Sequence, residues 1–468
     1  MTRSSVRLAL TGCILLLAAL WLPGLRYPVV SDTAFYALLG KSFWTDGTYT
    51  LFGVPYAKHL PLHALLSYPL VAMFGWSLGM KISTLLAGWA VVLLTFAVLR
   101  RAFGSGVALA AAALLSIHHG FVFMTMLGSA DLLFTSLFLV AIFAVLRAKE
   151  DERWYLAAGI TAGLSCVTRY NGVPVLLALP LIAYVQSPRR LASPWLWAGM
   201  ILGATALGLW FARNAVAFGN PLHSLYTSEL ARESKGPLLQ LVSNAGYYLN
   251  PIHNILHLLL LCSFYGIWRF GRAQRVLLLA MFAVWVLTAI WWVQAMRFAM
   301  PVYPLLLGFA VAGLADIWRQ SMRWSKTVII ASVAILALTH LPALCFYAYG
   351  QCNAWVDRHV SWIPHNLGLT SEGFFAWAEA RDAFNELAPP GAVIAVDNVE
   401  NAIVGREGVF RPDIRVVSEV PRDACVYRIT QHPTAMQHIL WRSPSAPVTA
   451  VVVEGCGTDG EEEYKALY

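Results

Sequence analysis

Long apolar runs separated by short polar segments fill the first three quarters of the chain. A helix of close to 20 apolar residues crosses about 30 Å of hydrocarbon, and runs near this length recur as far as residue 348. We therefore expect about 11 transmembrane helices. They lie at residues 7–25, 81–99, 106–126, 130–147, 154–169, 171–187, 195–212, 252–268, 275–294, 298–317 and 327–348.

One further apolar run, residues 60–75, decides the topology. It is shorter than the others, contains Pro61 and Pro69, and follows a polar stretch. If it lies at the interface, every basic cluster faces the cytoplasm, whereas if it spans, all but the first cluster face outward. Because cytoplasmic loops carry an excess of Lys and Arg, the interfacial position is favoured. The clusters are Arg3/Arg7, Arg100/Arg101, Arg147/Lys149/Arg153, Arg189/Arg190, Arg269/Arg272/Arg275 and Arg319/Arg323/Lys326.

This topology gives a cytoplasmic N-terminus and three external segments: residues 26–80, 213–251 and the tail from about 350. The first contains an amphipathic piece at 33–44 beside the apolar run 60–75. The predicted fold is an all-α polytopic membrane bundle, residues 1–349. A small external α/β domain, residues 350–468, follows it.

The tail changes pattern along its length. A helical pattern at residues 371–387 ends at Pro-Pro-Gly, and four short runs then have strand character. The runs lie at 392–396, 414–417, 424–429 and 448–453. Cys352, Cys425 and Cys456 also lie in this tail, and a disulfide among them is compatible with an oxidising space.

Composition supports lipid as the main solvent, because only 12% of residues are charged against roughly 25% in soluble domains. The net charge of +8 is divided among small clusters between apolar runs, so we expect no nucleic-acid partner. The N-terminal segment carries no small-residue cleavage site before Arg26 and is expected to remain as the first helix.

Two carboxylates are expected near the outer membrane surface. Asp32 follows the first span, and Asp131 begins the fourth. Ionisable residues at membrane depth are costly, which makes both candidate catalytic residues. A structural role is the alternative: Asp32 could cap the helix that follows, and Asp131 could interact with a helix dipole.

Cationic and polar side chains share the predicted outer surface with these carboxylates. Such donors suit a phosphate group, with Arg offering a bidentate fork. Taken singly, each could instead be an interfacial anchor. The candidate substrate-binding residues are Lys58, His59, Arg169, Arg213, Asn214 and Arg297.

A metal or nucleotide cofactor has little support in the sequence. His253 and His257 share a helix face, but no acidic partner or Asp-x-Asp sequence accompanies them. His118-His119 lies within an apolar span. No Walker or dinucleotide motif is present, so we expect no cofactor.

An ordered series of short motifs resembles the GT-C superfamily of membrane glycosyltransferases. The similarity extends over roughly residues 1–320, especially to the bacterial group related to protein O-mannosyltransferases and the lipid A aminoarabinose transferase. Its elements are the early Asp, Lys-His-Leu-Pro-Leu at 58–62, Ser-Ala-Asp at 129–131, Leu-Ser-Cys-Val-Thr-Arg at 164–169, Trp-Phe-Ala-Arg-Asn at 210–214 and Pro-Val-Tyr-Pro at 301–304.

The resemblance implies that Asp32 is the catalytic carboxylate. Relatives usually carry a second acid directly after it, where this chain has Thr33, and this departure suggests a metal-independent version. Lys58 matches the Lys of a Lys-Pro-Pro-Leu sequence in relatives, and Asp131 matches their Ser-Glu-Pro acid loosely.

The resemblance thus implies a hexosyl- or pentosyltransferase, mannosyltransferase-like, in the bacterial inner membrane. It would take a sugar from a polyprenyl-phosphate donor and pass it to an unidentified lipid, glycan or protein acceptor outside. Asp32 would act as base in an inverting displacement, with Asp131 sharing this role or binding sugar hydroxyls. The alternatives are a polytopic transporter or flippase, and a non-catalytic member that binds lipid or partners; transporters tend to have internal repeats, and we find none.

Overall fold

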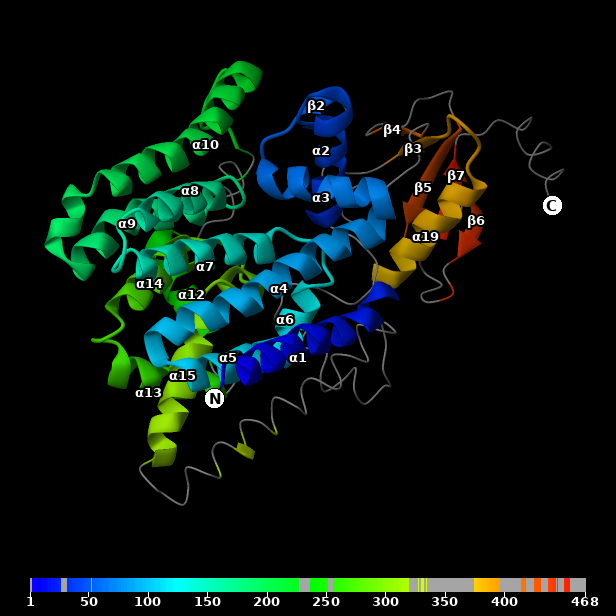
Figure 1. Ribbon diagram of the computed structural model, residues 1–468. Helices are drawn as coiled ribbons and strands as arrows, with labels where there is room; N and C mark the ends of the chain where they lie inside the picture. The colour runs from blue at the N-terminus through cyan, green and yellow to red at the C-terminus, as the bar shows by residue number, and fades with distance from the viewer. Residues whose placement is uncertain are drawn as a thin grey trace.

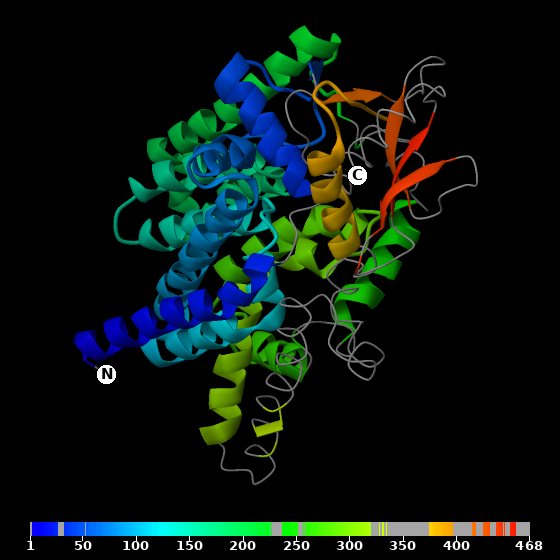
Figure 2. The ribbon, with the colours of Figure 1, turned by 90° about the vertical axis from the view of Figure 1, so that its right-hand side faces the viewer.

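A computed structural model describes most of the membrane domain and parts of the tail. The described residues are 2–26, 32–51, 53–224, 226, 236–250, 256, 258–319, 327, 330, 331, 334, 374–395, 414–417, 425–430, 437–442, 444 and 450–454. A helical bundle makes up most of this structure. Figures 1 and 2 show a small sheet with one helix on the side of the bundle opposite the N-terminus.

The helices follow the predicted apolar runs. Three of them are long and apolar enough to cross a membrane: Ser4–Leu25, Trp76–Phe103 and Pro194–Phe218. The number of eleven spans stays a prediction, because several helices are shorter and residues 327–348 lie largely outside the described part. The helices at the predicted spans are α1 (Arg3–Trp21), α4 (Trp76–Phe103), α5 (Ser105–Ile117), α6 (His119–Met124), α7 (Asp131–Arg147), α8 (Trp154–Cys166), α9 (Gly172–Gln186), α10 (Pro194–Phe218), α13 (Leu258–Phe270), α14 (Arg275–Ile290) and α15 (Tyr303–Arg319).

The third predicted span is broken. His118 has extended backbone angles (φ −70°, ψ 119°), so the helix stops at Ile117 and restarts as α6. The rings of His118 and His119 are stacked and buried at this break. They lie among the core helices and away from the candidate site described below.

The segment predicted to be the first external loop, called the first loop below, folds into α2 (Asp32–Asp46), the short strands β1 (Thr50–Leu51) and β2 (Val54–Pro55), and α3 (Pro61–Phe74). The 14 residues of α3 extend about 21 Å at 1.5 Å per residue, less than the roughly 30 Å of the hydrocarbon core. Because α8 and α13, at predicted spans, have only 13 residues each, this length does not decide between the two positions, and the interfacial one stays a prediction. Helices α2 and α3 pack on each other and hold the loop as a unit.

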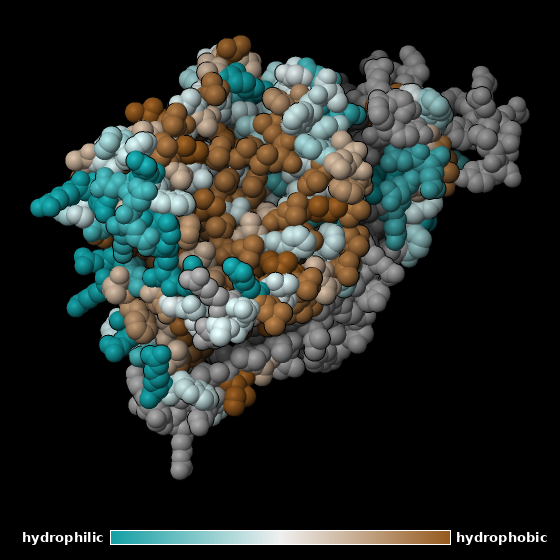
Figure 3. Space-filling view, in the orientation of Figure 1, coloured by the Kyte–Doolittle hydropathy of each residue, from teal (hydrophilic) through white to brown (hydrophobic). Residues whose placement is uncertain are grey.

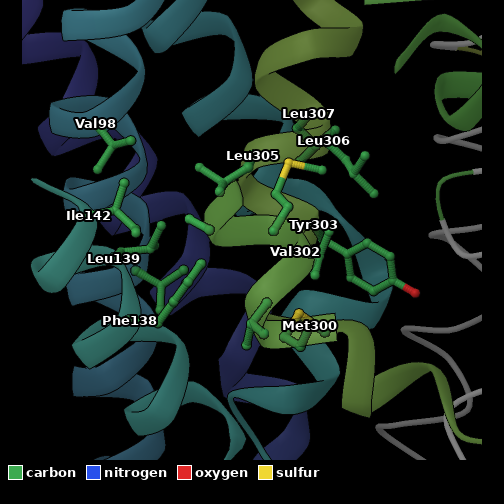
Figure 4. Packing of buried hydrophobic residues seen from close by; sticks show 14 of the residues in the cluster. Val98, Phe138, Leu139, Ile142, Met300, Val302, Tyr303, Leu305, Leu306 and Leu307 are labelled. Carbon is green, nitrogen blue, oxygen red and sulfur yellow. The ribbon is translucent and has the colours of Figure 1, made fainter. Parts of the chain in front are cut away.

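Buried apolar side chains fill the bundle interior, and apolar side chains also cover much of its outside. Figure 4 shows Val98 of α4 and Phe138 of α7 facing the residues at the start of α15, such as Leu305. Outward-facing residues such as Leu209 and Phe282 are largely exposed. The brown area in Figure 3 shows the apolar exterior between hydrophilic regions, as expected for a surface in contact with lipid.

Helices α8 and α10 cross at unusually close range. Gly159 and Gly163 of α8 face Gly199 and Gly203 of α10, and a Cβ atom added at any of them would collide with the opposing backbone. Small residues four apart allow such packing where lipid surrounds the helices. The crossing positions α8, whose C-terminal end leads into the loop that carries Arg169.

The tail contains a five-stranded mixed sheet with helix α19 (Phe374–Leu387). The strand order is β4-β3-β5-β7-β6; β3 pairs in parallel with β4 and β5, and the pairs β5–β7 and β6–β7 are antiparallel. Cys425 is disulfide-bonded, whereas Cys352 and Cys456 lie outside the described residues. The strands are β3 (Val393–Ala395), β4 (Arg415–Val417), β5 (Val426–Thr430), β6 (His438–Arg442) and β7 (Ala450–Glu454).

The pattern of the tail therefore predicted its helix and four of its strands. The fifth strand, β6, was missed because its side chains are mostly half-buried or exposed and its apolar run is only Ile-Leu-Trp. The division into domains at residue 349 stays a prediction.

We predict that Gly203→Ala destabilises the protein, since its new methyl group would separate α8 from α10. Overpacking of this kind costs about 1–3 kcal/mol. Gly208→Ala is the matched control on the same helix: a Cβ there meets nothing within 4 Å, and Ala is the better helix former. Thermal unfolding in detergent measures both variants. Equal melting temperatures would refute the close crossing.

Candidate active site

A cavity of about 190 Å³ lies where the first loop meets two later segments. Its lining comes from four parts of the chain, which contribute carboxylate, cationic, hydroxyl and aromatic groups. From the first loop come Asp32, Tyr36, Lys58, His59 and Leu60; from the α8–α9 connection Thr168, Arg169, Tyr170 and Asn171; from the end of α14 and beyond Leu287, Thr288, Trp291, Trp292, Val293, Arg297 and Phe298; and Tyr226 completes the wall.

Asp32 is the only carboxylate among the lining residues, and it is held on both sides. Arg297 Nη2 lies 3.2 Å from its Oδ2, and His59 Nε2 lies 3.4 Å from its Oδ1. Asp32 opens α2, where the helix N-terminus also favours a negative charge. The side chain remains 31% exposed, so a ligand in the cavity can reach it.

The pKa of Asp32 reflects opposing influences. Burial raises this pKa, but the Arg297 guanidinium, contact with His59 and the charge of Arg169 outweigh burial and hold it well below its usual range. The carboxylate is therefore ionised at neutral pH. In the protein without a ligand, Asp32 binds a proton weakly, because the positive charge of Arg297 stabilises the ionised carboxylate.

His59 is fixed by its neighbours. Its ring stacks on Phe35 at a centroid distance of 4.8 Å, and Tyr56 Oη lies 2.9 Å from its Nδ1. With Nδ1 engaged by a hydroxyl, Nε2 is the atom directed at Asp32. A histidine whose second nitrogen is engaged in this way keeps one ring orientation.

Asp131 lies beneath the cavity instead of in its wall. It is 2% exposed, its Oδ1 is 2.9 Å from Arg169 Nη1, and Ser129 Oγ donates to its Oδ2 at 2.9 Å. Arg169 does line the cavity. The ion pair with Asp131 therefore fixes the orientation of the Arg169 guanidinium. Asp131 also lies in the first turn of α7, where the helix dipole favours a negative charge, as predicted.

Aromatic rings support the cations of the cavity. The ring of Phe298 lies 5.2 Å from the guanidinium carbons of both Arg169 and Arg297, and Lys58 Nζ lies 5.5 Å from the ring of Tyr226. These distances are within the range of cation–π attraction. Three cationic side chains thus face one lining carboxylate, and the surplus positive charge suits an anionic ligand such as a phosphate.

Arg213 and Asn214, which the sequence puts forward as substrate-binding residues, are not among the residues that line the cavity. Arg213 donates to the carbonyl oxygens of Tyr49 and Tyr56 at 2.6 and 2.9 Å. Asn214 is buried, and its amide donates to the carbonyl of His223. Arg213 thus holds the first loop in place, and Asn214 accepts a hydrogen bond from Arg213 Nη1 at 2.9 Å.

Several lining residues were not predicted. The rings of Trp291 and Trp292 lie with centroids 3.9 Å apart at an interplanar angle of 32°, and both contact Tyr226. In the sequence, such a pair at the end of an apolar run is typical of an interfacial belt, and nothing there distinguishes a cavity wall. His253 and His257 lie outside the described residues.

Comparison with known proteins finds one family match. Residues 59–210 match the family model described as dolichyl-phosphate-mannose-protein mannosyltransferase. No curated protein matches the chain. The matched segment contains His59, Asp131 and Arg169, three residues of the site or its support.

Solved structures share the fold over nearly the whole chain. ArnT from Cupriavidus metallidurans bound to undecaprenyl phosphate is 15% identical with a TM-score of 0.65, covering 98% of this chain and 99% of that one. The apo state of the same protein is 15% identical with a TM-score of 0.63, covering 95% of this chain and 98% of that one. AglB from Archaeoglobus fulgidus, in complex with an inhibitory peptide and a dolichol-phosphate, is 14% identical with a TM-score of 0.50. The match covers 86% of this chain and 64% of AglB. The chain has the ArnT fold, and this fold together with the family match over residues 59–210 supports the resemblance to the GT-C superfamily.

His63, in the first turn of α3, is buried beside a backbone carbonyl. Its Nε2 lies 2.8 Å from the carbonyl oxygen of Gly128, and burial lowers its pKa to about 4, with this carbonyl and the Asp131 carboxylate offsetting only part of the effect. The unfolded chain has an ordinary histidine pKa of about 6.5. Between these values the unfolded state binds more protons than the folded state.

We therefore predict that stability is lost as pH falls from about 6.5 toward 4, by at most about 1.4 kcal/mol per pH unit from this group. Melting temperatures in detergent across this range should fall less steeply for His63→Gln than for the wild type. The slope is compared, since the substitution also changes the absolute stability. Parallel curves would show that His63 is not the titrating group.

Proposed function

We propose that this chain is a GT-C glycosyltransferase that transfers a sugar from a polyprenyl-phosphate donor to an acceptor at the external membrane surface. The observation that carries the proposal is the ionised carboxylate of Asp32, which faces a cavity with surplus positive charge. The fold shared with ArnT, which was crystallised with undecaprenyl phosphate, supports a lipid phosphate as the anion.

Lys58, Arg169 and Arg297 are the groups we assign to the donor phosphate. All three line the cavity, and none of them belongs to the same local segment as another. Negative charge grows on the phosphate as the bond between sugar C1 and the phosphate oxygen breaks. Preorganised cations stabilise that charge most effectively in a site with little water.

Asp32 is the base in this proposal. The acceptor hydroxyl oxygen bonds to C1, its proton passes to Asp32, and polyprenyl phosphate leaves with the electron pair of the broken bond. An incoming phosphate competes with the carboxylate for Arg297. As that contact weakens, the pKa of Asp32 rises toward its ordinary value and the carboxylate becomes a better proton acceptor.

The remaining predicted residues take supporting roles. Asp131 is buried and bonded to Arg169, so we propose that it orients this guanidinium and does not share the base role. Among the residues that the structure describes, no three His, Cys, Asp or Glu side chains are grouped to bind a metal. The metal-independent transfer suggested by Thr33 beside Asp32 stays a prediction.

The location follows from the charge pattern. We propose a multi-pass protein of the bacterial inner membrane, with a cytoplasmic N-terminus. Its cavity and the tail from residue 350 would face the external side. A lipid-linked donor fits this location because nucleotide sugars are cytoplasmic.

We predict that Asp32→Asn lowers kcat about 10²- to 10⁴-fold, the usual contribution of a general base. Transfer of radiolabelled sugar from polyprenyl phosphate by the purified protein in detergent measures it. Asp316→Asn is the matched control: that carboxylate also pairs with an arginine, Arg269, at 3.3 Å, but it lies on α15 outside the cavity lining. Wild-type turnover in Asp32→Asn would remove Asp32 from the mechanism.

A further inference from the structure

Helix α12 (Pro237–Leu249) has its polar side turned inward. Gln240, Asn244 and Tyr248 recur every four residues, so they share one face, and each is at most 3% exposed. The helix contains no charged residue. Its outward face is apolar and exposed at Leu238, Leu239 and Val242. This is the reverse of a helix that borders water, and it fits a helix between lipid and a polar protein surface.

The amide of Asn244 caps the end of the neighbouring helix α14. Its Nδ2 lies 3.1, 2.9 and 2.8 Å from the carbonyl oxygens of Thr288, Ala289 and Trp291. Helix α14 ends at Ile290, so Ala289 lies in the last turn, where carbonyls lack partners in their own helix. The Thr288 carbonyl also accepts from the backbone N–H of Trp291 at 3.4 Å, and Trp291 itself follows the helix.

The same side chain is engaged at its oxygen. Asn244 Oδ1 accepts from Gln240 Nε2 and from Gln294 Nε2, both at 3.1 Å. Every polar atom of this buried amide is thus used, which fixes its orientation. The hydrogen bonds of this amide therefore connect α12 to the end of α14 and to the segment that follows it.

Tyr248, one helical turn after Asn244, forms hydrogen bonds with the segment that follows α14. Its hydroxyl donates to the carbonyl of Ala295 at 3.1 Å, and the backbone N–H of Ala295 donates back at 3.4 Å. The stretch 291–295 is therefore bound near both of its ends. Directly after it comes the short helix η3 (Met296–Ala299), which carries Arg297 and Phe298.

We propose that α12 sets the position of Arg297, with Asn244 and Tyr248 as positioning residues. Neither residue lines the cavity, but both fix the backbone from which Arg297 reaches Asp32. Without Asn244 the carbonyls of Ala289 and Trp291 would lose this donor, and a buried group left unsatisfied drives local rearrangement. The aromatic wall of Trp291 and Trp292 depends on the same contacts.

The first test needs no ligand. Hydrogen–deuterium exchange of the full chain in detergent should be faster at residues 291–298 in Asn244→Leu and Tyr248→Phe than in the wild type. Val242→Ala, on the outward face of the same helix, should leave exchange there unchanged. Tyr248→Phe keeps the ring and tests the proposal even if Asn244→Leu fails to fold. Unchanged exchange in Tyr248→Phe would overturn it.

The second test rests on the proposed function and uses undecaprenyl phosphate as the probe. Its Kd, followed by intrinsic tryptophan fluorescence, should rise roughly tenfold or more in Asn244→Leu, the scale of a lost buried hydrogen-bonding group. If Asn244 acts through Arg297, adding Asn244→Leu to Arg297→Gln should produce little further loss.

Additive losses in that double variant would overturn the link to Arg297. The melting temperatures of all variants are measured alongside, since a purely structural role would lower them without this non-additivity. Failure of the wild type to bind undecaprenyl phosphate would count against the proposed function instead. In that case the exchange measurement still decides whether α12 holds the segment.

Discussion

The ion pair between Asp32 and Arg297 is the contact on which the site depends. It joins the head of α2, early in the chain, to the segment before α15, so it closes the cavity between two parts of the fold that local sequence does not link. Removing charges from water is costly unless each is paired. Neighbouring groups stabilise both charges further: His59 contacts the carboxylate of Asp32, and the ring of Phe298 lies beside the guanidinium of Arg297.

Each charged group near this pair is anchored by a different element. Asp131 and Ser129 fix Arg169 from the start of α7, and Arg213 uses its donors on the carbonyls of the first loop. A partner for every charged group is expected where hydrocarbon surrounds a site, because an unpaired polar group there has a high free energy. It also explains how the two candidate carboxylates come to differ. One is exposed to the cavity, while the other is enclosed and already bonded.

Sequence reasoning was most successful where a property repeats along the chain. Apolar runs predicted the helices, the loop helix at 60–75 and most strands of the tail, because periodicity and length are visible in one dimension. It also singled out Asp32, Lys58, His59, Arg169 and Arg297, which the structure brings to one cavity.

The remaining features depend on contacts between distant segments. Arg213 appears in the sequence as a cation at a helix end, and only the folded loop reveals the carbonyls that occupy it. The polar face of α12 is likewise legible as a pattern, but its partner, the end of α14, is not. Trp291 and Trp292 carry no mark that separates a cavity wall from an interfacial belt.

The strength of the Asp32–Arg297 contact has a consequence for the order of events in the proposed reaction. A carboxylate held by a guanidinium is a weak base, so the free protein is poorly prepared to deprotonate an acceptor. In the proposed reaction, a phosphate that draws Arg297 away would restore the basicity of Asp32. Donor binding would then precede activation of the acceptor. The same arrangement would protect the lipid-linked sugar from water, because the base becomes effective only once the cavity is occupied.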